Sequence, residues 1–407
     1  DEKGKIIPAI TIVNNGTLNL NDAVIETNDT INVITNNGTI NATNSVVKAK
    51  SGYAIYNNDG TINADENTYF KANSYAFYNN SSNEAKLTSG NYEGIYNTKT
   101  LVIDGANVKM SKTESLTGIY NSGTLTINSG IIDVEIVQNG YAYAYGIQNI
   151  SVLNMNGGEI KVTHTCVNNV DCSSYQKYAY GIYSDKNSNS IVTKISGVSI
   201  LSSGTGLYQY YGSSVNVDNS IIESVDNGLN VSRANVTIKG SNIKSSSNGV
   251  YVSASSGVRN VSIIGGTITT DRYGIYSRGD YYYSGSTKYC YYQEFNVGED
   301  ENPVVIKSKN VGIYLDDCNK MTIKDAYITS STSNGIYLNS ENNILNLGDN
   351  NLFIQKTTPF VMGETYGVNV NAGSFNFYDG LIKGKTGANR GAITAVPEAS
   401  IVKSEYD

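Results

Sequence analysis

The pattern that decides the fold is contained in Gly118-Ile119-Tyr120-Asn121-Ser122-Gly123-Thr124-Leu125-Thr126-Ile127-Asn128-Ser129-Gly130. It begins with a small residue, an aliphatic residue and a tyrosine, and it continues with a short apolar–polar alternation. Such alternation has the two-residue period of a β-strand, while Gly, Asn and Ser favour tight turns. The stretch is therefore expected to form short strands joined by turns.

The opening phrase, which we call motif 1, recurs along the whole chain. Its copies with an aromatic third residue are Ala54-Ile55-Tyr56, Ala76-Phe77-Tyr78, Gly94-Ile95-Tyr96, Gly118-Ile119-Tyr120, Gly181-Ile182-Tyr183, Gly206-Leu207-Tyr208, Gly249-Val250-Tyr251, Gly274-Ile275-Tyr276, Gly312-Ile313-Tyr314 and Gly335-Ile336-Tyr337. Most copies begin 18 to 25 residues after the previous one. Self-similarity at such a period is typical of stacked supersecondary units and predicts a solenoid.

Two further alternating phrases follow each copy of motif 1. Motif 2 is exemplified by Gly38-Thr39-Ile40-Asn41 and Thr124-Leu125-Thr126-Ile127, and motif 3 by Val46-Val47-Lys48 and Ile131-Ile132-Asp133. About 22 residues with three strands match one coil of a parallel β-helix, in which each strand pairs with its equivalent one coil away, at roughly 4.8 Å. Leucine-rich repeats and propeller blades have other spacings.

We therefore predict an all-β fold, a right-handed single-stranded parallel β-helix of about fifteen coils with three short strands each. The β-helix domain is expected to span residues 1–395, with loop insertions near 138–180, 277–303 and 340–365. Residues 396–407 leave the repeat and are predicted to form a C-terminal cap or a linker.

Strand alternation also predicts where the motif 1 side chains point. The aliphatic residue should face the core and the tyrosine should face outward, so that the tyrosines of successive coils form a ladder. The asparagines that follow four of them, Asn57, Asn79, Asn97 and Asn121, are expected to form a ladder of hydrogen-bonded amides. Both ladders are explained by stability alone, but an aromatic face is also suited to binding sugar rings or protein.

The composition limits the classes of partner. The chain of 407 residues carries a net charge of −7 with a pI near 5.0 and no basic run, which argues against binding to nucleic acid. No apolar stretch approaches 18 residues, so no transmembrane segment is predicted. A chain that opens at Asp1 without Met is expected to be a mature or trimmed segment.

Tyrosine-rich insertions are the best candidates for binding. With 33 Tyr, seven Phe and no Trp, tyrosine is the only common aromatic residue, and it combines an apolar ring with a hydroxyl. Loops on a rigid scaffold commonly carry binding residues. The alternative is that these loops simply pack on the coils. The candidate binding residues are Tyr141, Tyr143, Tyr145, Tyr175, Tyr178, Tyr281, Tyr282, Tyr283, Tyr291 and Tyr292.

The four cysteines allow more than one interpretation. Cys166 and Cys172 lie six residues apart in one insertion, and Cys290 and Cys318 lie 28 apart, about one coil. Disulfides within each pair are predicted if the protein is exported, and free thiols are the alternative. A metal site of Cys166, Cys172 and His164 would lack a fourth ligand, so we predict no metal and no other cofactor.

Candidate catalytic residues are few. The best acidic pair is Asp316-Asp317, which lies just after the motif 1 copy Gly312-Ile313-Tyr314. A polygalacturonase-like site would also need Asn-Thr-Asp and Gly-His-Gly on neighbouring coils, and neither is present. Consecutive aspartates in a strand point to opposite faces and act together only at a turn or bulge. The sequence therefore favours a protein that is not an enzyme.

The stretch from Gly118 to Gly130 resembles the pectate-lyase-like β-helix repeats of large bacterial cell-surface adhesins, and the resemblance extends from about Thr11 to Ile393. It implies an extracellular adhesin or stalk, secreted or at the cell surface, that is part of a longer protein and monomeric rather than trimeric. The expected partner is a host-surface or microbial glycan or protein. A polysaccharide lyase or glycoside hydrolase of the same fold class, using Asp316 and Asp317, is the alternative.

Overall fold

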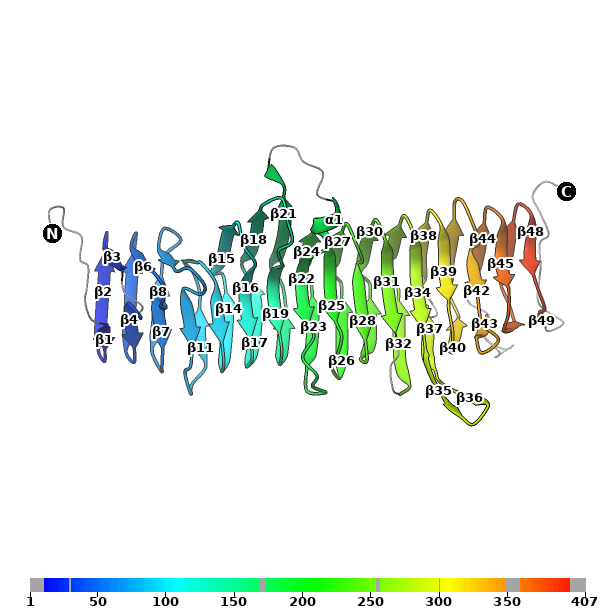
Figure 1. Cartoon of the computed structure of the whole chain (residues 1–407), viewed down its shortest axis with the longest axis horizontal. Helices are drawn as coiled ribbons and strands as arrows, with labels where there is room; N and C mark the ends of the chain where they lie inside the picture. Colours follow the sequence, from blue (N-terminus) through cyan, green and yellow to red (C-terminus); the bar gives the residue numbers. More distant parts are fainter. Residues whose placement is uncertain are drawn as a thin grey trace. The chain divides into compact units, whose positions relative to one another are not determined.

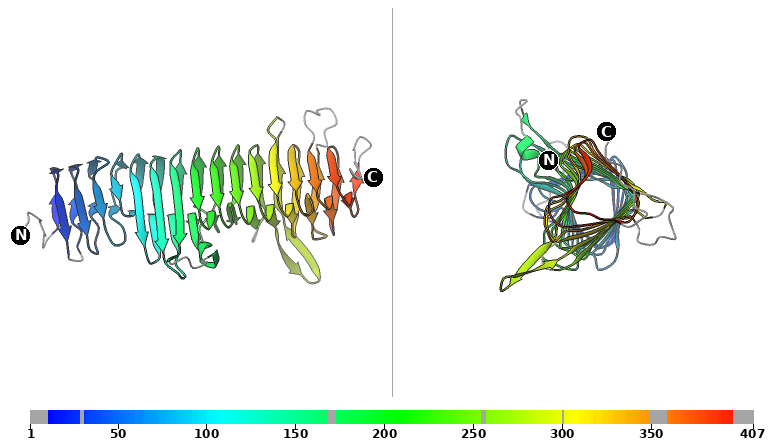
Figure 2. Two further views of the ribbon diagram at one scale, coloured as in Figure 1. Left: turned by 90° about the horizontal axis from the view of Figure 1, so that it is seen from above. Right: turned by 90° about the vertical axis from the view of Figure 1, so that its right-hand side faces the viewer.

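The predicted β-solenoid is confirmed by a computed structural model, which describes residues 11–28, 31–167, 173–253, 257–299, 301–348 and 359–395. The protein is 61% strand and forms a parallel β-solenoid of about 15 turns with three strands in each coil. It divides into two compact units, Asp1–Gly204 and Thr205–Asp407. Within each unit the equivalent strands of successive coils lie side by side (Figure 1), and the coil has three sides in the end-on view of Figure 2.

In the first unit, the strands of each motif pair in parallel only with strands of the same motif. The motif 1 strands are β1 (Ile12–Asn14), β4 (Ile34–Asn36), β7 (Ile55–Asn57), β10 (Phe77–Asn79), β13 (Ile95–Asn97), β16 (Leu116–Asn121), β19 (Ala144–Asn149) and β22 (Ala179–Ser184). The motif 2 strands form two sheets, one of β2 (Thr17–Asn21), β5 (Thr39–Thr43) and β8 (Thr61–Ala64), the other of β11 (Ala85–Leu87), β14 (Thr100–Asp104), β17 (Thr124–Ser129), β20 (Val152–Met155) and β23 (Val192–Ser196). The motif 3 strands are β3 (Val24–Thr27), β6 (Val46–Ala49), β9 (Tyr69–Lys71), β12 (Asn91–Tyr92), β15 (Asn107–Lys112), β18 (Ile131–Val137), β21 (Glu159–Thr165) and β24 (Ser199–Ser202).

The second unit repeats this arrangement. Its motif 1 strands are β25 (Thr205–Gln209), β28 (Leu229–Ser232), β31 (Asn248–Ser253), β34 (Tyr273–Arg278), β39 (Val311–Leu315), β42 (Ile336–Leu338), β45 (Tyr366–Val370) and β48 (Gly387–Arg390). Its motif 2 strands are β26 (Ser214–Asp218), β29 (Asn235–Lys239), β32 (Arg259–Ile264), β37 (Gln293–Val297), β40 (Asn319–Ile323), β43 (Ile344–Leu347), β46 (Ser374–Phe377) and β49 (Thr394–Ala395). Its motif 3 strands are β27 (Ile221–Ser224), β30 (Asn242–Ser245), β33 (Thr267–Thr270), β38 (Val304–Ser308), β41 (Ala326–Ser330), β44 (Phe360–Gly363) and β47 (Leu381–Gly384).

Two elements depart from the repeat. A short helix, α1 (Ser173–Gln176), lies in the first predicted insertion. The second insertion contains an antiparallel hairpin of β35 (Asp280–Ser284) and β36 (Thr287–Tyr291), which projects away from the coils of its unit (Figure 1). Much of the third insertion, residues 349–358, and the predicted C-terminal segment from 396 lie outside the described residues. Within the described part of the chain, no helix is long and apolar enough to cross a membrane.

Strand register places like residues next to like. Tyr78 pairs with Tyr56 on one side and with Tyr96 on the other, and the neighbouring isoleucines and asparagines follow the same register. Ile55 and Ile95 are fully buried, whereas the tyrosines between the buried positions are half-buried. The predicted orientation of motif 1 is therefore confirmed. Burial of each such aliphatic side chain stabilises the fold by roughly 1.5–3 kcal/mol.

The predicted amide ladder is confirmed from Asn79 onward and is buried, whereas the buried Nδ2 atom of Asn57, the remaining predicted member, has no hydrogen-bond partner, so the ladder is interrupted between Asn57 and Asn79. The Nδ2 atom of Asn79 donates to Oδ1 of Asn97 at 2.9 Å, Asn97 donates to Asn121 at 2.8 Å, and Asn121 donates to Asn149 at 2.8 Å. These four side chains are fully buried. Asn97 Nδ2 additionally donates to the backbone carbonyl of Thr124 at 3.2 Å. The amides of Asn79, Asn97 and Asn121 are stable in the core because each donates to an asparagine one coil away.

Replacing Asn97 by alanine should interrupt this ladder. The Asn79 amide would keep only the Thr100 carbonyl as acceptor and the Asn121 carbonyl only the Gly123 N–H as donor, and both would remain buried, so we expect destabilisation of about 1–3 kcal/mol. Denaturant unfolding followed by circular dichroism measures the loss. Asn128→Ala is the matched control, because Asn128 accepts a similar hydrogen bond from Asn156 at 3.0 Å but on the exposed surface. Equal effects of the two substitutions would contradict a role for burial.

Candidate functional site

The predicted tyrosine ladder is present in each unit. In the second unit, stacked rings join Tyr251 to Tyr276 at 5.0 Å, Tyr276 to Tyr314 at 5.3 Å and Tyr314 to Tyr337 at 5.2 Å between centroids. In the first unit, the stack comprises Tyr56, Tyr78, Tyr96 and Tyr120, with centroids 4.7 to 5.1 Å apart. Because neighbouring rings cover each other's faces, the ladders serve stability first.

Burial affects the ionisation of these tyrosines. It raises the pKa of Tyr314 to about 12, and the charge of Asp316 adds to the shift. Burial raises the pKa of Tyr276 as well, and its hydroxyl donates a hydrogen bond of 3.0 Å to Oδ2 of Asp316. Both phenols are therefore neutral hydrogen-bond donors at neutral pH.

The Asp316–Asp317 pair lies in the turn that follows β39, not within the strand. Besides Tyr276, Asp316 accepts a hydrogen bond from Nδ2 of Asn339 at 3.1 Å, and Nε of Arg278 lies 3.7 Å from its Oδ2 atom. Its carboxylate therefore joins three coils: those of Tyr276 and Arg278, of Asp316 itself and of Asn339.

Asp317 is held more tightly. Its Oδ2 atom accepts a hydrogen bond from Nζ of Lys288 at 2.6 Å, and its Oδ1 atom accepts from Oγ of Ser340 at 2.6 Å and from the backbone N–H of Cys318 at 2.9 Å. Burial acts to raise its pKa, but the hydrogen bonds from Lys288, Ser340 and Asn342 outweigh burial and the pKa is lowered. Asp317 is therefore ionised at neutral pH, and both of its carboxylate oxygens accept hydrogen bonds.

The partner Lys288 belongs to the β35–β36 hairpin, so the ion pair fastens the hairpin to the coil. A disulfide between Cys290 and Cys318, with Cα atoms 5.4 Å apart, makes a second connection between the same two segments. Lys288 Nζ also lies 4.1 Å from the centre of the Tyr281 ring, a cation–π contact. The three interactions together hold the hairpin in a defined place.

The hairpin exposes aromatic surface that the ladders do not. The exposed fractions are 36% for Tyr281, 46% for Tyr282, 63% for Tyr283 and 45% for Tyr289. Tyr282 and Tyr289 stack across the hairpin with centroids 5.2 Å apart. The other two predicted binding residues of this insertion, Tyr291 and Tyr292, are half-buried, and Tyr291 packs against Tyr282 at 5.4 Å.

The predicted binding residues of the first insertion form a separate cluster in the first unit. Tyr141 is 74% exposed and meets the edge of Tyr175 at 4.8 Å, while Tyr143 contacts Tyr178 at 5.2 Å. Tyr145 is half-buried. This cluster therefore also exposes aromatic surface, chiefly at Tyr141.

The predicted metal ligands do not form a complete site within the described residues. His164 is buried, and its Nε2 atom lies 3.0 Å from the backbone oxygen of Gln138. Cys166 is in a disulfide, and Cys172, its predicted partner, lies outside the described residues. No group of three or more His, Cys, Asp or Glu among the described residues is arranged to hold a metal ion.

The structure thus brings together the tyrosines of the hairpin, Asp317 and the Cys290–Cys318 disulfide. The sequence interpretation missed Lys288, whose only signal is that it is the single basic residue among 280–291. It also missed the tyrosines that stand three residues before a ladder tyrosine, such as Tyr273, which lies 5.0 Å from Tyr314. No family model, curated protein or solved structure matches this chain.

The raised pKa values predict alkaline unfolding of the ladders. A tyrosine whose folded pKa lies above its unfolded value of about 10 contributes stability that is present below pH 10 and is lost as pH rises through the folded pKa. For Tyr314 this window ends near pH 12. Tyrosinate absorbance and far-ultraviolet circular dichroism, recorded together, should show late ionisation that coincides with loss of strand signal. Tyr314→Phe should remove one late-ionising phenol, and an unchanged late phase would contradict the assignment.

Asp317→Asn should loosen the hairpin without unfolding the coils. With the disulfide reduced, we expect amide hydrogen exchange in Tyr281–Tyr291 to become roughly tenfold faster, because hydrogen bonds to a charged group are lost. Since the pKa of Asp317 is lowered in the folded protein, its contribution is present above about pH 4 and is lost as pH falls through the folded pKa. Asp271→Asn, at an exposed position, is the control. Equally fast exchange in both variants would show that the ion pair between Asp317 and Lys288 does not fasten the hairpin to the coil.

Proposed function

We propose that this protein is a non-catalytic extracellular adhesin or stalk that binds glycans through the exposed tyrosines of the β35–β36 hairpin. The observation that carries the proposal is the exposure of Tyr281, Tyr282, Tyr283 and Tyr289, at 36% to 63%, on a hairpin that is tied to the coil. Contiguous exposed aromatic surface of this kind marks an interaction site.

The chemistry of the exposed surface suits carbohydrate. A sugar ring has an apolar face of C–H groups and a rim of hydroxyls, and tyrosine offers an apolar face and a hydroxyl in return. In the ladders the rings are stacked between neighbouring coils and half-buried, whereas the hairpin tyrosines stay 36% to 63% exposed even though Tyr282 stacks on Tyr289. Because the hairpin is already ordered, little conformational entropy is lost on binding.

The charges around the hairpin favour a neutral ligand. Residues 280–291 contain only two charged side chains, those of Asp280 and Lys288. Lys288 is paired with Asp317 and covers the ring of Tyr281. The exposed surface between them consists of phenol rings, hydroxyls and backbone. Such a surface has no charge with which to bind a charged sugar, but it accommodates uncharged sugars.

The rival function is a polysaccharide lyase or glycoside hydrolase that uses Asp316 and Asp317. Glycoside hydrolysis needs one carboxyl group that protonates the leaving oxygen and a second that acts as nucleophile or base. Asp317 is occupied by Lys288 and Ser340, and Asp316 by Tyr276 and Asn339. These contacts explain both residues as anchors of the coil and the hairpin, which supports binding over catalysis.

An extracellular location is supported by the redox state of the cysteines. The Cys290–Cys318 disulfide, and the disulfide that includes Cys166, are stable in an oxidising environment. The resemblance of the repeats to pectate-lyase-like regions of bacterial adhesins suggests attachment to a host or microbial surface as the role. In that role the solenoid displays the hairpin and the hairpin makes the contact.

The variant Tyr281→Ala/Tyr282→Ala/Tyr283→Ala tests this proposal. We expect at least tenfold weaker binding to immobilised glycans or to cells, because the open ring faces are removed while circular dichroism stays unchanged. The matched control is Tyr69→Ala/Tyr327→Ala, which removes tyrosines that are 43% and 50% exposed on strand surfaces. Unchanged attachment of the hairpin variant would refute the proposal. Product release from glycans that Asp317→Asn abolishes would establish the rival function instead.

A further inference from the structure

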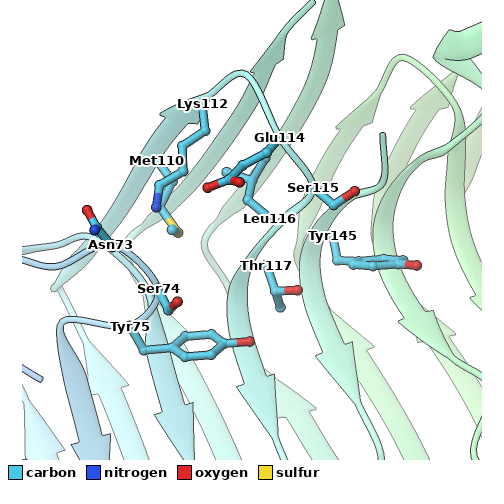
Figure 3. A pocket seen from close by; sticks show the side chains of 10 residues that line it. All are labelled: Asn73, Ser74, Tyr75, Met110, Lys112, Glu114, Ser115, Leu116, Thr117 and Tyr145. Atoms are coloured by element: carbon cyan, nitrogen blue, oxygen red, sulfur yellow. The ribbon is translucent and has the colours of Figure 1, made fainter. Parts of the chain in front are cut away.

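A cavity of about 330 Å³ opens where the motif 3 side meets the motif 1 side of the first unit (Figure 3). It lies far in sequence from the hairpin and is built entirely from residues of the first unit. The residues that line it are Asn73, Ser74, Tyr75, Met110, Lys112, Glu114, Ser115, Leu116, Thr117 and Tyr145.

The cavity arises from a difference in connector length. The chain passes from motif 3 to motif 1 through residues 72–76 in one coil and 113–115 in another, but through only Glu93 and Gly94 in the coil between them. The short connector is possible because Gly94 adopts a φ of 83°, where a Cβ atom would lie 2.6 Å from the backbone oxygen of Ser74. The two longer connectors therefore stand on either side of a notch.

The same notch interrupts a second column of tyrosines. Tyr75 and Tyr145 each stand three residues before a ladder position. In the coil next to that of Tyr145, the equivalent residue is Thr117, which pairs in register with Tyr145. In the coil between Tyr75 and Thr117, the equivalent residue is Glu93. Its Oε1 atom lies 3.9 Å from Nζ of Lys71, which belongs to a motif 3 strand. A small residue thus takes the place of an aromatic ring between Tyr75 and Tyr145.

The lining combines aromatic, hydroxyl and balanced charged groups. Figure 3 shows Tyr75 and Thr117 on one side of the cavity and Lys112 and Glu114 on the other. Burial raises the pKa of Tyr75 to about 12, although a hydrogen bond with Thr117 opposes the shift. The phenol of Tyr75 is therefore neutral and is hydrogen-bonded to Thr117. Lys112 and Glu114 carry opposite charges, so the cavity has no net charge.

We propose that this cavity binds a single terminal pyranose residue of a neutral glycan. A volume of about 330 Å³ is at the small end for ligand sites, roughly 300–1,000 Å³, and suits a sugar residue rather than a chain. Tyr75 offers a partner for the apolar side of the sugar, and Asn73, Ser74 and Ser115 surround the rim with groups that bind hydroxyls. Tyr75 and Tyr145 bound the notch at its two ends along the column of tyrosines. The remainder of the glycan therefore extends from the cavity towards solvent. This inference rests on the proposed glycan binding but concerns a second, independent site.

Thr117→Tyr tests the inference, because it completes the column of rings and fills the notch. Saturation-transfer NMR with methyl β-glucopyranoside, methyl β-galactopyranoside and methyl N-acetyl-β-glucosaminide measures binding to the full chain. We expect at least one of these glycosides to bind the wild type and to bind Thr117→Tyr at least tenfold more weakly. Thr126→Tyr is the matched control, because it adds the same ring at an outward position of β17. Ser74→Tyr, at the exposed rim, blocks the mouth should Thr117→Tyr fail to fold.

The two proposals fail in distinguishable ways. If none of the three glycosides binds the wild type, or if both folded notch variants bind as the wild type does, the cavity proposal is overturned, whatever the hairpin does. If the alanine variant of Tyr281, Tyr282 and Tyr283 keeps the glycoside signal while losing glycan attachment, both proposals stand. If it keeps both, the cavity site stands and the hairpin proposal falls.

Discussion

The in-register parallel stacking of coils is the constraint on which the rest of the structure depends. Because each strand pairs with the same strand of the next coil, a residue type that recurs with the period meets itself at about 4.8 Å. The buried amides from Asn79 to Asn149 are acceptable in the core only for this reason, since each donor finds an acceptor one coil away. The tyrosine stacks follow from the same geometry on the outer face.

Candidate function lies where this regularity is broken. One break is an insertion, the β35–β36 hairpin, which carries tyrosines whose faces no neighbouring coil covers. The other is a shortened connector at Glu93–Gly94, which leaves a cavity between two longer ones. A solenoid without such breaks presents stacked rings in repeating rows, whereas the insertion exposes tyrosines and the shortened connector leaves a cavity lined by Tyr75 and Tyr145.

Two adjacent carboxylates fasten the junction between the hairpin and the coil. Asp316 and Asp317 follow the ladder tyrosine of β39 and lie where the hairpin leaves the coil. One carboxylate contacts the ladder through Tyr276 and the other binds Lys288 of the hairpin. An acidic pair that resembles a catalytic site in sequence is thus occupied by structural contacts, and the disulfide of Cys318, the next residue, reinforces the same junction.

The sequence by itself determined the β-solenoid, the inward aliphatics, the outward tyrosines and the amide ladder, because these depend only on a two-residue alternation within strands and a period of about 22 residues between them. Tertiary structure alone decided the partners of Asp317 and the cavity beside Thr117. Lys288 and Asp317 are separated by 29 residues, and Tyr75 and Tyr145 by 70. Whether such residues meet depends on the lengths of the connectors and on the path of the hairpin, which no local pattern of residues encodes.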